Sequence, residues 1–117
     1  MLRTLIVGTG QTGSLTIKRM ISGDDDVHGD PVALVDDDQT KWGQRVHGVK
    51  VWGACQEIEK IARDAEAEQI VLACPSASRA ERLRILEFCM KTGLRVLTLP
   101  NVRDIPINGL GRLYPNN

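Results

Sequence analysis

A glycine-rich hexapeptide near the N-terminus constrains the fold of this chain more than any other feature. The motif GTGQTG (residues 8–13) follows the β-branched run 5–7 and precedes a segment of helical periodicity. In such a motif the first glycine permits a tight turn, the second lets a phosphate approach the backbone, and the third lets helix and strand pack closely. The N–H groups that begin the helix also favour a phosphate. The motif predicts a nucleotide-binding strand–turn–helix unit; the alternative is a glycine-rich turn without a ligand.

Apolar strand-like runs alternate with amphipathic segments along the first hundred residues. Short apolar runs predict five strands, at 3–7, 31–35, 49–51, 69–73 and 95–99. Apolar residues at helical spacing predict three helices, over 11–21, 57–67 and 78–91. In the last helix we expect a capping box, Ser78 with Glu81, and an apolar stripe. The residues of that stripe are Leu83, Leu86 and Met90, widened by Ala80 and Cys89.

The order of these elements predicts the fold class. Strands that alternate with helices form a parallel sheet with right-handed crossovers. We therefore expect an α/β, doubly wound, Rossmann-like sheet of about five strands in the order 3-2-1-4-5, with helices on both faces. Its 117 residues fit one domain. We assign residues 1–105 to this nucleotide-binding domain and residues 106–117 to a linker or truncated tail.

Acidic residues follow the second predicted strand, where a dinucleotide-binding fold places a ribose ligand. Asp36 stands 23 residues after Gly13, close to the ~20 expected for the carboxylate that accepts hydrogen bonds from ribose hydroxyls. A carboxylate there repels a 2′-phosphate, so NAD is favoured over NADP. Asp37 is the neighbouring candidate, because the end of the strand is not fixed to one residue. The alternative is a polar turn, and Asp38 is expected to be solvated.

Two further segments border the predicted crevice. Ligands of an open α/β sheet lie beyond the carboxyl ends of the strands, at the point where the strand order reverses. Pro75 and Ser76 follow the fourth predicted strand and would border the same crevice as Gly10. Lys41 and Arg45 lie in the loop after the acidic residues and could reach an adenine or a phosphate, although solvated loop charges are the alternative.

Composition excludes several classes of function. The 15 basic and 15 acidic residues give a formal net charge of zero, whereas a nucleic-acid-binding domain would carry a basic surplus. We expect no nucleic-acid partner. No apolar run approaches the ~20 residues that span a bilayer, so no membrane contact is expected from this chain. The three cysteines are widely spaced and form no Cys-x-x-Cys pair, which favours reduced thiols in the cytoplasm.

The sequence offers no set of catalytic residues. A short-chain dehydrogenase uses a Tyr-x-x-x-Lys pair, and the single tyrosine, Tyr114, has only three residues after it. His28 and His47 have no partner at the spacing of a triad or a metal site. We therefore predict no catalytic residue and no metal, and we do not expect this chain to catalyse a reaction alone.

The chain resembles the nucleotide-binding domain of CapD-like polysaccharide biosynthesis proteins, which are nucleoside-diphosphate-sugar epimerases and dehydratases of bacteria. The resemblance covers residues 3–105 and is carried, in order, by GTGQTG, VDDDQTKWGQRVHGVKVWG, VLACPSASRAERLRILEFC and LRVLTLPNVRDI. It implies a dinucleotide at the glycine-rich turn, a separate downstream catalytic domain and, in a membrane-anchored protein, a place on the cytoplasmic face. Together, spacing and resemblance give as cofactor-binding residues Gly8, Thr9, Gly10, Gln11, Thr12, Gly13, Asp36, Asp37, Lys41, Arg45, Pro75 and Ser76.

Three functions fit these predictions. The first is an NAD(P)-binding domain of a nucleotide-sugar epimerase or dehydratase in capsular or surface polysaccharide biosynthesis, without the catalytic domain. The alternatives are a UDP-sugar-binding domain of a sugar acyltransferase and a CoA-binding domain of the same fold. An exposed edge at the third predicted strand also makes a homo-oligomer possible.

Overall fold

A computed structural model describes residues 1–23, 28–75, 77–99 and 114–115 of this chain. The strands are β1 (Arg3–Val7), β2 (Asp30–Val35), β3 (Arg45–Val46), β4 (Val49–Gly53), β5 (Gln69–Leu72), β6 (Arg95–Thr98) and β7 (Tyr114–Pro115). The α-helices are α1 (Gln11–Ser22), α2 (Ile58–Asp64) and α3 (Arg79–Met90), and two 3-10 turns are η1 (Gln39–Lys41) and η2 (Cys55–Glu57). In the part of the chain that the structure describes, no helix is both long and apolar enough to cross a bilayer.

The sheet confirms the predicted α/β class. Its order is β3-β4-β2-β1-β5-β6-β7, and neighbours among β4, β2, β1, β5 and β6 pair in parallel. These five strands are the five predicted ones, in the predicted order. The sheet differs from the prediction by β3 and β7, two short strands that pair antiparallel at the edges. β3 lies in a segment that was predicted to be a loop, and it pairs with the start of β4.

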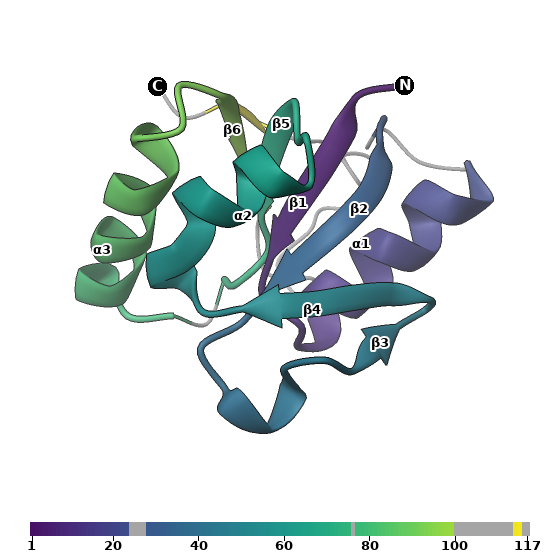
Figure 1. Ribbon diagram of the computed structural model, residues 1–117, viewed down its shortest axis with the longest axis horizontal. Helices are drawn as coiled ribbons and strands as arrows, with labels where there is room; N and C mark the ends of the chain where they lie inside the picture. The colour runs from purple at the N-terminus through teal and green to yellow at the C-terminus, as the bar shows by residue number, and fades with distance from the viewer. Residues whose placement is uncertain (24–27, 76, 100–113, 116–117) are drawn as a thin grey trace.

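Helices cover both faces of the sheet, as Figure 1 shows, with α1 on one side and α2 and α3 on the other. Because successive side chains of a strand point to opposite faces, β1 contributes Leu5 and Val7 to the core under α2 and α3. It contributes Ile6 to the core under α1. All three side chains are fully buried. This two-sided burial is the reason that the central strands read as continuous apolar runs.

The predicted apolar stripe of α3 is correct only in part. Cys89 belongs to the core and Leu86 packs against it, whereas Ala80, Leu83 and Met90 are exposed. Leu83 is 54% exposed and Met90 is 73% exposed, whereas Ile85 and Cys89 are buried at 4% and 0%. The helix carries apolar residues on two sides, so helical spacing alone does not decide which side meets the sheet. The Ser78 half of the predicted capping box is confirmed, since the Ser78 hydroxyl accepts a hydrogen bond from the Glu81 N–H at 3.1 Å.

Candidate functional site

The glycine-rich turn joins β1 to α1, and two of its glycines are required by the backbone around them. Gly8 has a φ of +105°, and a Cβ at this position would lie 2.7 Å from the carbonyl oxygen of Ala73. A Cβ on Gly13 would lie 2.0 Å from the carbonyl oxygen of Gly8. Gly8 therefore permits the tight turn beside β5, and Gly13 permits the close approach of α1 to β1. These are the first and third roles that the motif predicts.

Gly10 is the glycine that leaves room for a ligand. It is the N-cap of α1, and no side chain caps this helix end. Its φ is −70°, and a Cβ built on it would meet nothing within 4 Å. The first N–H groups of a helix have no partner within the helix, and the helix dipole makes this end favourable for an anion. The turn thus offers an open approach to backbone donors, which suits a phosphate.

Asp36 lies directly beside this turn. One carboxylate oxygen, Oδ2, accepts hydrogen bonds from the backbone N–H of Thr9, at 3.0 Å, and from the Thr9 hydroxyl. The other, Oδ1, accepts from the N–H of Asp38 at 2.8 Å. Gly8 N–H donates to the carbonyl of Val35, the last residue of β2, at 2.9 Å. The acid predicted for the ribose and the glycines predicted for the phosphates are therefore neighbours in space.

Asp37 has different partners from Asp36. Its Oδ1 accepts from the backbone N–H of Cys55 at 2.9 Å, and its Oδ2 accepts from Arg84 Nη2 on α3 at 2.7 Å. Both oxygens are thus engaged with η2 and α3, so Asp36 is the carboxylate that adjoins the glycine-rich turn. Sequence spacing alone left both residues open.

The Asp37 contacts lead to a prediction about pH. Partial burial raises the pKa of Asp37, but the hydrogen bonds from Cys55 and Arg84 outweigh it, so the net pKa lies below the ordinary 3.8. A carboxyl with a depressed folded-state pKa stabilises the fold above its unfolded pKa, and this contribution disappears as pH falls through the folded pKa. We expect Asp37→Asn to lower the free energy of unfolding at pH 7 by less than about 1 kcal/mol, because the pair is half exposed.

Urea unfolding of the wild type and of Asp37→Asn, from pH 7 downward, tests this prediction. The stability difference should narrow as pH falls below 3.8. An Arg84→Met variant and the double variant complete a double-mutant cycle. A difference that stays constant across the pH range would show that the charge of Asp37 contributes nothing.

The connection from β2 to β4 carries the two predicted basic residues. Arg45 Nη1 donates to the carbonyl of Gly48 at 3.0 Å, within the β3–β4 hairpin, and Lys41 is half-buried at the end of η1. Within the described residues, neither side chain forms a hydrogen bond with the glycine-rich turn. The hairpin instead reaches α1 through His47, whose Nε2 lies 3.0 Å from the Ser14 hydroxyl.

Sequence reasoning missed this His47 contact. His47 and Gly48 both have positive φ, at 49° and 87°, as in the two-residue turns that close tight hairpins. The sequence signal for this hairpin turn was a glycine between the apolar residues Val46 and Val49. A His-Gly pair, however, indicates a hairpin turn more weakly than Asn-Gly does.

The β5–α3 connection brings Pro75 to the same edge of the sheet. A Cβ on Gly8 would lie 3.4 Å from the Cys74 Cβ, so the residue before Pro75 adjoins the turn. Arg82 Nη2 donates to the carbonyl of Pro75 at 2.8 Å. Ser76, the other residue predicted here, lies outside the described residues.

The thiols are not poised for nucleophilic chemistry. Burial raises the pKa of Cys89 to about 12 and raises the pKa of Cys55 and Cys74 as well, and a thiolate is the reactive form. Among the described residues, no group of three or more His, Cys, Asp and Glu side chains could hold a metal ion.

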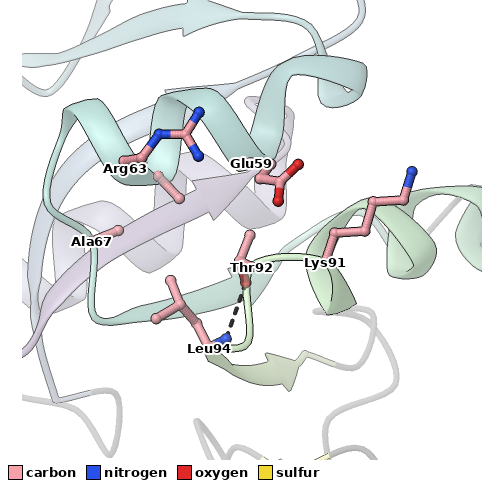
Figure 2. Close-up of a pocket in the computed structure, with 7 residues that line it drawn as sticks. Glu59, Arg63, Ala67, Lys91, Thr92 and Leu94 are labelled. Atoms are coloured by element: carbon pink, nitrogen blue, oxygen red, sulfur yellow. Dashed lines mark hydrogen bonds between the residues drawn. The ribbon is translucent and has the colours of Figure 1, made fainter.

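A groove of about 240 Å³ lies elsewhere, where α2 meets the end of α3 (Figure 2). Its lining residues are Glu59, Ala62, Arg63, Ala67, Lys91, Thr92 and Leu94. Figure 2 shows the turn before β6 on one side, where the N–H of Leu94 donates to the Thr92 hydroxyl at 3.1 Å. This groove adjoins the amino ends of β5 and β6, whereas the glycine-rich turn lies at the carboxyl ends.

Comparison with known proteins identifies relatives of this chain. The chain is 32% identical over 103 residues to the capsular polysaccharide biosynthesis protein CapD of Staphylococcus aureus, and the match covers 87% of this chain. It is also 32% identical over 104 residues to the probable polysaccharide biosynthesis protein EpsC of Bacillus subtilis (strain 168). The chain thus resembles a segment of these polysaccharide biosynthesis proteins. It spans 17% of the length of each of these two relatives, and no family model matches it.

Solved structures agree with the observed fold. The crystal structure of UDP-D-quinovosamine 4-dehydrogenase from Vibrio fischeri superposes with a TM-score of 0.84 and 28% identity, over 99% of this chain and 93% of that chain. RSP, a Rex-family repressor, in complex with beta-NADH superposes with a TM-score of 0.67 and 12% identity, over 87% of this chain and 47% of that chain. The similarity to RSP is one of fold alone. Both comparisons confirm the predicted Rossmann-like class, and the curated relatives confirm the predicted family resemblance.

Proposed function

We propose that this chain binds NAD as the dinucleotide-binding domain of a nucleoside-diphosphate-sugar epimerase or dehydratase of capsular or surface polysaccharide biosynthesis. The observation that carries the proposal is the open backbone at Gly10, next to the Asp36 carboxylate held by Thr9. A pyrophosphate at the N-terminus of α1 and a ribose at Asp36 would belong to one dinucleotide. The likeness to a UDP-sugar dehydrogenase and to an NADH-binding fold supports the choice.

The chemistry of the reaction is assigned to another part of the enzyme. The 117 residues hold no Tyr-x-x-x-Lys pair, and the described thiols are held protonated by burial. Residues 8–13 would bind the phosphates, Asp36 would bind the ribose of the adenosine, and Pro75 would border the same crevice. The proposal places the protein in the cytoplasm, or on the cytoplasmic face of a membrane, where nucleotide sugars are made.

A ligand panel tests the proposal. A ligand that binds the folded chain raises its midpoint of thermal unfolding by mass action. We expect NAD to raise the midpoint more than NADP, and we expect CoA and a UDP-sugar to give smaller shifts. A UDP-sugar shift larger than that of NAD would support the acyltransferase-type alternative, and the absence of any shift at millimolar ligand would contradict all three.

Asp36→Asn is expected to weaken NAD binding about tenfold, because hydrogen bonds to a charged acceptor contribute about 1.5–3 kcal/mol. An asparagine retains one acceptor for the Thr9 N–H, so the fold should be preserved. The preference for NAD over NADP should narrow, since the repelling charge is lost. Titration calorimetry with both dinucleotides measures this, with Asp30→Asn as the control.

Asp30 is an exposed carboxylate at the amino end of β2, whereas Asp36 follows the carboxyl end of that strand. Its substitution therefore removes an equal charge away from the site. Equal NAD affinity for Asp36→Asn and Asp30→Asn would remove Asp36 from the ribose site.

A further inference from the structure

Trp42 contacts the backbone of Asp36, the residue assigned to the ribose. Its indole Nε1–H donates a hydrogen bond to the backbone carbonyl of Asp36 at 2.7 Å. Trp42 is 39% exposed, so a large part of its surface faces solvent instead of the core. Because the indole N–H is already hydrogen-bonded, the exposed part of the ring is an apolar surface that a ligand can contact.

The backbone on both sides of this ring is fixed. The N–H of Trp42 donates to Gln39 at 3.2 Å, and the next N–H, that of Gly43, donates to Val51 on β4 at 2.8 Å. The N–H of Asp36 donates to Gly53, the last residue of β4, at 2.9 Å. Trp42 is therefore held at the carboxyl edge of the sheet, and Figure 1 shows its connection lying beyond the arrowhead of β2.

We propose that Trp42 is the stacking platform for the adenine of the bound dinucleotide. The inference rests on the proposed function. In a dinucleotide the adenine is joined to the ribose that Asp36 would bind, so the base lies within reach of a ring that is bonded to Asp36. Stacking of a base on an aromatic side chain is a common source of affinity and needs only an exposed, held ring.

The other tryptophan provides a matched comparison. Trp52 on β4 is 40% exposed, almost the same as Trp42. Its ring lies under the Lys50 ammonium, with Nζ 5.7 Å from the ring centroid. Among the described residues, the indole hydrogen bond to Asp36 comes from Trp42 and not from Trp52. The two residues thus share type and exposure and differ in their place relative to the proposed ribose site.

Tryptophan fluorescence tests the proposal directly. In Trp52→Phe, Trp42 is the only tryptophan of the chain. We expect saturable quenching by NAD and by ADP, both of which carry adenine, and no saturable quenching by nicotinamide mononucleotide, which lacks it. Unchanged fluorescence at ADP concentrations that saturate binding in calorimetry would overturn the proposal.

Calorimetry on variants gives the second readout. Trp42→Ala should lose about tenfold in affinity for NAD, whereas Trp42→Phe, which keeps a ring, and Trp52→Ala should stay within about threefold of the wild type. Circular dichroism establishes that each variant is folded. If Trp42→Ala binds NAD as the wild type does while Asp36→Asn is weakened, the stacking proposal fails and the proposed function stands. If the wild type binds no dinucleotide, both fail.

Discussion

Replacing Gly13 with alanine is expected to destabilise the fold by about 3 kcal/mol or more, at the upper end of overpacking effects. The new Cβ would lie 2.0 Å from the carbonyl oxygen of Gly8 and 2.9 Å from its carbonyl carbon. Both are backbone atoms of the β1–α1 turn, so no side-chain rotation relieves the overlap. The helix must move away from β1, which opens the core between Ile17 and the sheet.

Thermal and urea unfolding followed by circular dichroism measure this effect. A loss of this size should lower the midpoint of thermal unfolding by on the order of 10 °C in a domain of this length. The matched control is Gly10→Ala, three residues earlier in the same turn. A midpoint for Gly13→Ala within about 2 °C of the wild type would contradict the close packing of α1 on the turn.

Gly10→Ala is expected to keep the fold and lose the ligand. The backbone of Gly10 is in an extended conformation that any residue adopts, and a Cβ there meets nothing within 4 Å. The methyl group would instead occupy the space through which a phosphate approaches the N–H groups at the start of α1. We expect stability within about 0.5 kcal/mol of the wild type and an affinity for NAD at least about tenfold lower.

Titration calorimetry with NAD, together with thermal unfolding, measures both halves of this prediction. We expect Gly13→Ala to lower mainly the stability and Gly10→Ala to lower mainly the affinity for NAD. The two variants therefore separate the structural role of the turn from its ligand-binding role. Normal NAD affinity in a folded Gly10→Ala chain would mean that the glycine-rich turn does not hold the phosphates.

The sequence predicted the central architecture because its signals are local and strong. The runs around Ile6, Leu34 and Val71 are apolar on both faces of the sheet, and a strand buried on both sides has few other interpretations. The glycine motif located the β1–α1 turn, since a Cβ on Gly8 or Gly13 would overlap backbone atoms of the folded chain.

Features that depend on tertiary contacts could not be predicted from the sequence. In α3, packing against α2 and the sheet buries Ile85 and leaves Leu83 and Met90 exposed. Helical spacing alone does not make this choice. Sequence spacing also could not show that Asp37 turns away from the glycine-rich turn. Its carboxylate accepts a hydrogen bond from Arg84, which lies 47 residues further along the chain. The β3–β4 hairpin is too short for periodicity to detect, so its contact with Ser14 could not be predicted.

The central claim, that the carboxyl edge around the glycine-rich turn binds NAD, is tested most directly by amide chemical shifts. A ¹⁵N-labelled chain is titrated with NAD, and each backbone N–H reports its own surroundings. We predict saturable shifts at Gly10, Gln11 and Thr12 and at Asp36, with little change at Arg63 and Thr92 in the groove of Figure 2. Shifts confined to that groove, or no saturable shift at millimolar NAD, would contradict the claim.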